Sequence, residues 1–175
     1  MTAVEPYELT TLGGATDFAR LIVACESSGP YCLIGGLAVN CYVEPVYTLD
    51  ADIVVIAASL PDLIGRLSEQ GFKMEAHPHP VNATAPGSQL RIQFTTDERY
   101  RAFPARSVEA EVLGVRAKVA CLADVTQGKL WAYGDPQRRL SKRKKDELDL
   151  IRLAKAYPEL KSPYPGELRA QLDRG

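Results

Sequence analysis

Two aspartates separated by one residue form the part of the sequence best suited to catalysis. Asp50 and Asp52 stand at the start of an apolar, β-branched run, residues 51–57, that is typical of a buried strand. Because side chains alternate along a strand, both carboxylates point to the same face. Two such carboxylates repel each other unless a cation lies between them. The pair therefore indicates either a Mg²⁺ site shared with substrate phosphates or a strand end capped by solvated acids.

A pair of glycines precedes the aspartates. Gly35 and Gly36 follow a short apolar strand predicted over residues 31–34, and they precede a short helix predicted over residues 37–43. Glycine lets the backbone approach a bulky anion closely, and the N-terminus of a helix offers unpaired N–H groups to phosphate. The same residues would also suit a plain tight turn. The pair is thus a candidate phosphate-binding turn.

The C-terminal third adds a lysine and two aspartates. Lys129 lies in a predicted helix of small and apolar residues, where the pattern alone indicates a snorkelling surface lysine. Asp146 and Asp149 share one stripe of the next helix with Leu150 and Leu153, so they are predicted to face the protein body. The alternative for the two acids is that their negative charge stabilises the first helical turn.

A basic run lies between these elements. Residues 138–145 begin with Arg138 and Arg139 and are densely basic, in a chain whose net charge is −1. Such a run is usually a solvated face. Beside a nucleotide site it would bind an RNA backbone, with an affinity that falls as salt rises. Since the run holds no aromatic residue, no sequence-specific reading of bases is predicted.

Together these features resemble the signature of the DNA polymerase β-like nucleotidyltransferase superfamily. That signature is a Gly-Gly or Gly-Ser turn followed, about a dozen residues later, by Asp-x-Asp in a strand. The carboxyl-terminal third is similar to the abortive-infection toxin branch, the nucleotidyltransferase halves of toxin–antitoxin pairs, in which Lys-x-x-Ala, one or more Arg and Lys-Asp-x-x-Asp-Leu follow in order. The matching residues here are Gly35-Gly36, Asp50-x-Asp52, Lys129 to Ala132, Arg138-Arg139 and Lys145 to Leu150. The resemblance covers residues 31–157.

The resemblance implies a fold and a set of roles. The fold is a mixed β-sheet flanked by helices, with the C-terminal helices packed on it. Asp50 and Asp52 are implied to bind Mg²⁺, which orients an NTP while a hydroxyl attacks its α-phosphate. The other implied roles are close approach to the triphosphate by Gly35 and Gly36, contact with its phosphates by Lys129 with Arg138 or Arg139, and completion of the pocket by Asp146 or Asp149.

One position departs from the superfamily's pattern. Its members usually carry a third carboxylate on a neighbouring strand, and the matching stretch, residues 90–95, holds Gln93 there. An amide offers an oxygen to a metal but no charge, so the affinity for Mg²⁺ should be lower. Glu75 and Asp97 are candidates to substitute for the missing acid. The departure bears on catalysis rather than on the fold.

Alternating helical and strand patterns predict an α/β (α+β) architecture. Helices are predicted over residues 15–27, 60–70, 122–133 and 142–157, and strands over residues 31–34, 51–57, 72–76, 89–95, 109–113 and 115–120. The last two strands are predicted to form a hairpin on Gly114. Residues 77–87 are predicted to be a loop, and its His77 and His79 fit no common zinc site.

Size and composition predict one globular domain. The chain has 175 residues, of which 46% are hydrophobic and 25% charged. We expect a nucleotidyltransferase-like domain over residues 1–160 and a loosely attached tail over residues 161–175. The four cysteines stand singly, which favours reduced thiols. Residues 1–9 do not resemble a signal peptide, and no apolar stretch approaches about 20 residues, so a cytoplasmic protein with no membrane partner is predicted.

Two functions follow from the sequence. The leading prediction is a Mg²⁺-dependent nucleotidyltransferase that moves NMP from an NTP to an RNA such as tRNA or to a protein hydroxyl; as a toxin it would have a cognate antitoxin as partner. The alternative is a non-catalytic module on the same fold that binds a nucleotide or a partner. Gln93 is the residue that favours the alternative.

Overall fold

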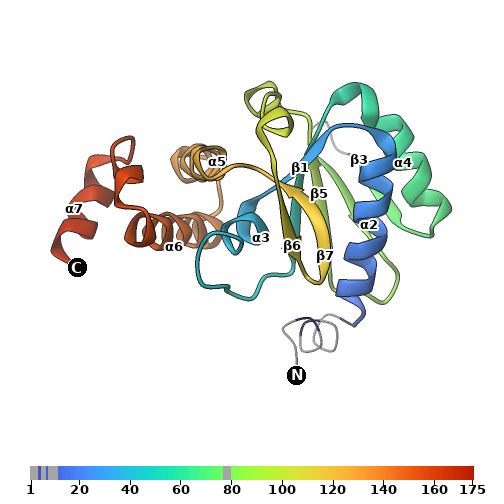
Figure 1. Ribbon diagram of the computed structural model, residues 1–175, viewed down its shortest axis with the longest axis horizontal. Coiled ribbons are helices and arrows are strands. Elements are labelled where there is room, and N and C mark those ends of the chain that lie inside the picture. The colour runs from blue at the N-terminus through green and yellow to red at the C-terminus, as the bar shows by residue number, and fades with distance from the viewer. Residues whose placement is uncertain (1–3, 5–6, 8–11, 77–79) are drawn as a thin grey trace.

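The computed structural model describes residues 4, 7, 12–76 and 80–175, and Figure 1 shows how they are arranged. The histidines at 77 and 79 and most of the stretch tested for a signal peptide lie outside the described residues.

The described residues build a seven-stranded mixed sheet in the order β3-β4-β5-β2-β1-β7-β6. Strand β2 runs antiparallel to β1 and parallel to β5, while β1 runs parallel to β7. The strands are β1 Tyr31–Ile34, β2 Asp50–Val55, β3 Lys73–Ala76, β4 Val81–Thr84, β5 Arg91–Thr95, β6 Val108–Val112 and β7 Val115–Val119. The strand that carries the two aspartates is therefore the centre of the sheet.

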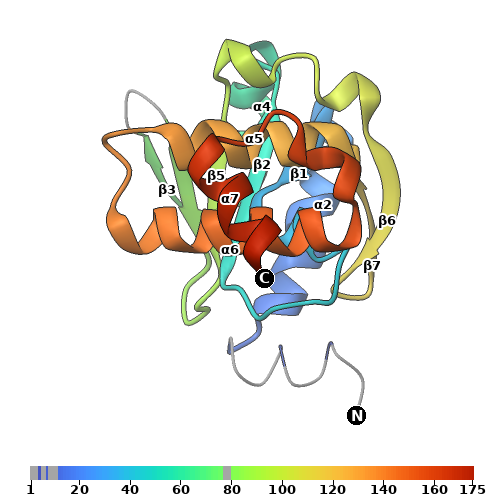
Figure 2. The ribbon, with the colours of Figure 1, turned by 90° about the vertical axis from the view of Figure 1, so that its left-hand side faces the viewer.

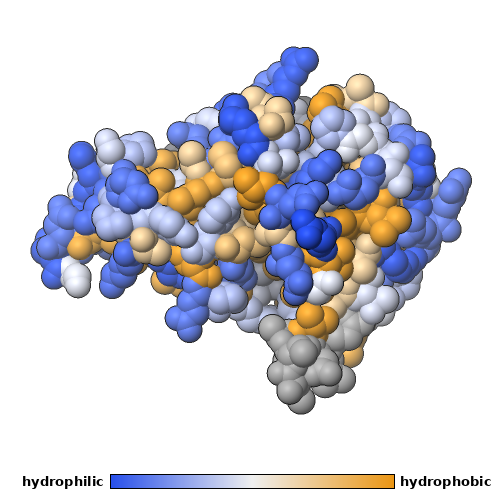
Figure 3. All heavy atoms as spheres, viewed as in Figure 1, coloured by the Kyte–Doolittle hydropathy of each residue, from blue (hydrophilic) through white to orange (hydrophobic). Residues whose placement is uncertain are grey.

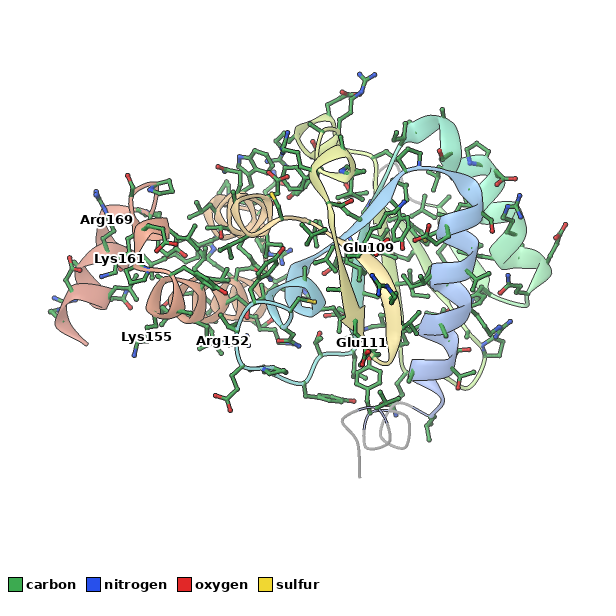
Figure 4. The ribbon with its side chains drawn as sticks, viewed as in Figure 1. Glu109, Glu111, Arg152, Lys155, Lys161 and Arg169 are labelled. Carbon is green, nitrogen blue, oxygen red and sulfur yellow. The ribbon has the colours of Figure 1, made fainter. Side chains whose placement is uncertain are left out.

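The sequence of β2 explains its central place. Its β-branched residues favour a strand, and its inner residues Ala51 and Ile53 are fully buried. Asp50 and Asp52 alternate with them and face the other way, as predicted. At the far edge, β6 carries Glu109 and Glu111 (Figure 4), exposed charges that discourage the addition of another strand.

Helices cover both faces of the sheet. Figure 1 shows α2 and α4 on one side and α3, α5 and α6 on the other, with α7 outermost. Figure 2 shows that α5 and α6 run side by side across the sheet. The helices are α2 Gly14–Ser28, α3 Gly35–Val39, α4 Leu60–Glu69, α5 Leu122–Gly134, α6 Leu140–Ala156 and α7 Gly166–Arg174, with short 3₁₀ turns η1 Ala57–Ser59, η2 Glu98–Tyr100, η3 Pro104–Arg106 and η4 Pro158–Lys161.

An ion pair and a hydrogen bond fix the start of α5. Arg106 Nε and Nη2 donate to the two carboxylate oxygens of Asp124 at 3.0 and 2.9 Å. This acid lies in the first turn of α5, where negative charge is favourable. Tyr42 Oη donates to the carbonyl of Ala120 at 2.7 Å. These contacts hold the start of α5 over the sheet and so fix the distance between α5 and the sheet.

Most predicted elements are confirmed with bounds that shift by one or two residues. The α/β class, the strand over residues 31–34 and the hairpin on Gly114 are as predicted. Three expectations about these elements were wrong. The helix predicted over residues 37–43 ends at Val39. Gly35 and Gly36 open the five-residue helix α3 instead of forming a separate turn, and β4 lies within the predicted loop. Strand β4 forms because its alternate residues Val81 and Ala83 are buried against the core.

The C-terminal segment, expected to be loosely attached, packs on α6. Tyr164 and Leu168 are buried, and together with Leu150 and Ala154 they make a second, smaller apolar cluster. Tyr164 Oη donates to the carbonyl of Leu150 at 2.9 Å. The prolines of this segment suggested a loose tail, but Tyr164 and Leu168 anchor it to α6.

Figure 3 shows one face of the molecule, on which polar and apolar residues are distributed unevenly. In the space-filling view, hydrophilic residues cover most of the C-terminal helices and apolar residues appear between them (Figure 3). Within the residues that the structure describes, no helix has the length and hydropathy that a membrane span requires.

The buried face of β2 should dominate stability. Replacing Ile53 by alanine removes a fully buried side chain, so Ile53→Ala should lower the free energy of unfolding by about 2–5 kcal/mol in urea titrations. The control is Val23→Ala on α2, where the side chain is 62% exposed and the change should stay within about 0.5 kcal/mol. Equal losses in the two variants would contradict this account of the core.

Candidate functional site

A cleft of about 1310 Å³ lies between the sheet and the α5–α6 pair. Its floor comes from the end of β1, from β2 and from β5, and its roof from α5, the α5–α6 loop and the start of α6. Asp52, Gln93, Lys129, Arg138 and Lys142 are among its lining residues. The volume exceeds the roughly 300–1,000 Å³ typical of small-ligand sites, because the cleft is broad and open to solvent along one side.

Gly35 makes room for the carboxylate of Asp52. The backbone of Gly35 has φ +71°, and a Cβ built there would lie 2.3 Å from Asp52 Oδ2. Any other residue would strain the backbone and collide with the acid. At Gly36 an added Cβ would only touch Thr48 at 3.6 Å. Of the two glycines, only Gly35 lines the cleft.

Asp52 is a carboxylate without an ion pair among the residues that the structure describes. Burial raises the pKa of the Asp52 carboxyl; the positive charge of Lys129 opposes the rise and the negative charge of Asp50 adds to it. The folded protein thus holds this acid in a place that disfavours its charged form, which is a common property of residues that act on a ligand.

Asp50 has the opposite environment. Arg91 Nε donates to its Oδ1 and Lys142 Nζ to its Oδ2, both at 2.7 Å. Burial would raise the pKa of the Asp50 carboxyl, but Lys142 and Arg91 outweigh burial and the pKa is lowered. The reading of Asp50 as a solvated strand cap is wrong, since both of its oxygens are engaged by cations.

Gln93 lies where the third carboxylate was expected. In the parallel pairing of β2 with β5, Asp52 is opposite Gln93, and Asp50 is opposite Arg91. The amide is therefore the neighbour of Asp52 on the same face of the sheet. The two acids named as substitutes do not take its place. Glu75 pairs with Lys73 on β3, and Asp97, which lines the cleft, pairs with Arg99.

Lys129 is buried between two acids of the next helix. Its Nζ lies 3.0 Å from Asp146 Oδ1 and 2.9 Å from Asp149 Oδ2. Burial alone would lower the pKa of the Lys129 ammonium, but Asp149 and Asp146 outweigh burial and raise it. The snorkelling alternative is wrong, because only 9% of the side chain is exposed.

Two arginines complete this buried group. Arg138 Nε donates to Asp146 Oδ2 at 2.5 Å, and Arg152 Nη1 donates to Asp149 Oδ1 at 2.8 Å. The alternative that the two acids stabilise a first helical turn is also wrong, since α6 begins at Leu140 and its first turn has no acid. With Lys129, the group holds three positive and two negative charges.

The structure brings together most but not all of the predicted site residues. Gly35, Asp52, Lys129, Arg138 and Asp146 line the cleft. Asp50 and Asp149 are not part of the lining, but each pairs with a lining residue, Lys142 and Lys129 respectively. Gly36 and Arg139 do not line the cleft.

Sequence reasoning missed three cations of the site. Arg91 could have been found only from the β2–β5 register, Lys142 was one of a run of basic residues, and Arg152 lies three residues after Asp149. Arg91 and Lys142 are far from Asp50 along the chain, whereas the i, i+3 spacing of Asp149 and Arg152 on a helix is a signal that the sequence did offer.

The oxygen atoms near Asp52 suit a single hard cation that is shared with a ligand, and they are too few to enclose a metal ion by themselves. Among the described residues no three His, Cys, Asp or Glu side chains gather as a metal site. The candidate oxygen ligands are the carboxylate of Asp52 and the amide oxygen of Gln93. The carboxylate of Asp50 could join them only if Arg91 or Lys142 moved away from it. Mg²⁺ is commonly held by one or two carboxylates together with substrate phosphates and water, so the residues present fit that ion when a nucleotide is bound.

Comparison with known proteins bears on the fold. No family model matches the sequence, and no curated protein matches it. The crystal structure of ANT(2'')-Ia in complex with adenylyl-2''-tobramycin has a TM-score of 0.59 and 15% identity, covering 91% of this chain and 97% of that one. An antigenic nucleotidyltransferase-like protein from Paracoccidioides brasiliensis has a TM-score of 0.50 and 17% identity, covering 91% and 92%. The chain therefore has the nucleotidyltransferase fold that its sequence predicted.

The two aspartates should affect stability in opposite directions at neutral pH. Asp52→Asn removes a charge that folding disfavours, so it should raise the free energy of unfolding by an amount on the order of 1 kcal/mol. Since the folded pKa of Asp52 is raised, this gain should vanish as the pH falls below the ordinary value of 3.8. Urea titrations in the presence of a chelator measure both effects.

Asp50→Asn should instead lower the free energy of unfolding at neutral pH, by about 1.5–3 kcal/mol, because two cations lose the negative charge they pair with and one of them faces an NH₂ group instead of an oxygen. The folded pKa of Asp50 is lowered, so its contribution is present above 3.8 and is lost as the pH falls through the lowered value. The exposed Asp173→Asn serves as control. For the other variant, a fall in the free energy of unfolding of Asp52→Asn at neutral pH would show that Asp52 is not an unpaired acid.

Proposed function

We propose that the protein transfers NMP from an NTP to an acceptor hydroxyl, with a divalent cation such as Mg²⁺. The observation that carries the proposal is the placement of Asp52. This acid faces a large cleft, beside a glycine that makes room for it and opposite three cations on α5, the α5–α6 loop and α6. A polyanion with a bound cation would match both sides of such a cleft: the cation would neutralise Asp52, and the anionic groups would pair with the cations of the helices.

The charges of the site support a polyanionic ligand. Around Asp52 and Lys129, the five cations, Lys129, Arg138, Arg152, Arg91 and Lys142, outnumber the four acids, Asp50, Asp52, Asp146 and Asp149, by one. The rest of the cleft lining adds Arg99 and three acids, Asp97, Glu98 and Asp135. Arg138 and Lys142 reach the cleft and remain partly exposed, at 34% and 30% of their side chains. They are the cations that phosphates can approach, while the buried Lys129 adds positive charge from behind.

Each side chain then has a task in the transfer. Arg138 and Lys142 bind and orient the triphosphate, and Asp146 keeps Arg138 and Lys129 in place. Asp52 would hold Mg²⁺, which would supply positive charge to the reacting phosphate. The acceptor oxygen forms a bond to the α-phosphorus and loses its proton, the bond from that phosphorus to the bridging oxygen breaks, and pyrophosphate leaves. Alignment and electrostatics provide the acceleration.

The acceptor we propose is an RNA, with a protein hydroxyl as the second choice. The basic run that starts at Arg138 continues along α6 from Lys142, at the mouth of the cleft, and provides charge for a phosphate backbone. A role as the toxin of a toxin–antitoxin pair, with a cognate antitoxin as partner, rests on the resemblance of the C-terminal third to that branch.

A second function is favoured by a specific observation. Gln93 replaces an acid beside Asp52, and Asp50 is already neutralised by Arg91 and Lys142. A site with one free carboxylate can hold a nucleotide without turning it over. The alternative is therefore a non-catalytic module that binds a nucleotide or a partner on the same fold.

Transfer of label tests the first function. With NTPs labelled in the α-phosphate, Mg²⁺ and total RNA or cell lysate, the wild type should label an acceptor. Asp52→Asn and Asp50→Ala should reduce the labelling by about 10²-fold or more, since each removes a carboxylate that would hold the divalent cation at the reacting phosphate. Asp173→Asn, on the exposed face of α7, should keep the wild-type rate.

Equal labelling by the wild type and both site variants would reject the enzyme. Calorimetry then separates the remaining cases. Binding of an NTP without transfer supports the non-catalytic module, and the absence of any nucleotide binding contradicts both functions.

Lys142 should compete with a divalent cation for Asp50. The ammonium group lies 2.7 Å from Asp50 Oδ2, so Lys142→Met should free that oxygen and strengthen the binding of Mn²⁺ by about tenfold in the absence of nucleotide. Electron paramagnetic resonance of free Mn²⁺ measures the affinity. Lys155→Met removes the same charge from the far end of α6, where the side chain points away from the sheet (Figure 4), and should have no effect. Unchanged affinity in Lys142→Met would show that Asp50 takes no part in metal binding.

A further inference from the structure

An aromatic cluster closes one end of the cleft. The rings of Phe103 and Trp131 are stacked, with centroids 5.9 Å apart and planes 12° apart. Tyr100 meets both rings edge-on, at 5.2 Å from Phe103 and 5.1 Å from Trp131. Phe103 is buried, whereas Tyr100 and Trp131 line the cleft.

An arginine lies over this cluster. The guanidinium carbon of Arg99 is 5.4 Å from the ring centroid of Trp131 and 5.8 Å from that of Tyr100. Asp97 holds the guanidinium in place, with Arg99 Nη2 donating to Oδ2 at 2.9 Å. The Arg99 side chain lines the cleft and is 55% exposed. The result is a planar, fixed group that rests on aromatic rings and remains open to the cleft.

This group lies in the same cleft as the phosphate-binding cations. Gln93, the neighbour of Asp52, lies two residues before the end of β5. From there the chain follows the cleft wall through Thr96 and Asp97 to Arg99. On the roof, Lys129 and Trp131 are two residues apart on α5, and both line the cleft. A ligand whose phosphates lie between Asp52 and Arg138 can therefore extend towards Arg99.

The chemistry of this wall selects a flat, uncharged ring. A second cation would be repelled by Arg99, which already covers the face of Trp131. An aliphatic group would gain no stacking from a guanidinium. A nucleobase has a π-face that stacks on guanidinium and aromatic groups, and such stacking tolerates all four bases.

We propose that Arg99, Tyr100 and Trp131 form a nucleobase-stacking subsite for the NTP. The inference rests on the proposed nucleotide binding and adds to it the place of the base. The backbone at Gly128 is part of the arrangement, because a Cβ there would lie 3.3 Å from Tyr100 Cε1 and press on the ring. The acceptor then enters from the side of α6 instead of from the aromatic end.

The single tryptophan of the chain reports on this subsite. In Mg²⁺ buffer, each of ATP, GTP, CTP and UTP should quench the emission of Trp131, and each should bind about tenfold more tightly than inorganic tripolyphosphate, since a stacked base adds affinity that the phosphates alone lack. Tripolyphosphate should bind with little change in emission.

Variants separate stacking from charge. Arg99→Ala and Arg99→Lys should both bring the affinity for ATP down to that for tripolyphosphate, while the affinity for tripolyphosphate itself stays within about twofold. The matched control is Arg101→Ala, since Arg101 lies two residues away, is 73% exposed and pairs only with Glu98 among the interactions described for it. It should leave both affinities unchanged.

The outcomes distinguish this inference from the proposed function. If tripolyphosphate binds and nucleotides bind no more tightly, the subsite is wrong and the phosphate site stands. If Arg99→Lys retains the full affinity for ATP, Arg99 acts by charge and the stacking role is wrong. If neither nucleotides nor tripolyphosphate bind, both the proposed function and the subsite are wrong.

Discussion

The buried pairing of Lys129 with Asp146 and Asp149 is the interaction on which the site depends. It joins α5 to α6 by ion pairs of 3.0 and 2.9 Å. Buried charges are tolerated only when they are fully paired, and here Arg138 and Arg152 complete the pairing. Because the two helices are locked in one register, they form a rigid roof over the sheet. The cleft, its cations and its aromatic end all take their positions from that roof.

The floor of the cleft depends on a second constraint, the register between β2 and β5. Parallel pairing sets Asp52 beside Gln93 and Asp50 beside Arg91. One carboxylate is thereby neutralised by its neighbour, and the other is left without a cation among the residues described. The asymmetry matters because the pKa of the Asp50 carboxyl is lowered and that of Asp52 is raised. Two acids that look equivalent in the sequence have different roles in the fold.

The environment of Asp52 has the character of a functional site. An acid whose charged form is disfavoured by burial lies against a glycine with φ +71° that leaves room for it. The rest of the molecule compensates through an extensive core on the other face of the sheet, which includes the fully buried Ile53. The nucleotidyltransferase fold is thus stabilised by the face of β2 that is turned away from the site, and the open face is available for chemistry.

The sequence by itself determined the α/β class, the buried strand with its two aspartates on one face, the hairpin on Gly114 and the existence of helices α5 and α6. Each of these follows from periodicity, β-branching or turn residues, which act over a few neighbouring positions. It could not determine β4, whose signal was masked by prolines and glycine, or the packing of α7. The partners of Asp50 and of Lys129 were decided by the tertiary structure alone. Lys142 is 92 residues from Asp50 along the chain. Such contacts depend on strand register and helix placement, which arise from the burial of the whole core, so local spacing does not encode them.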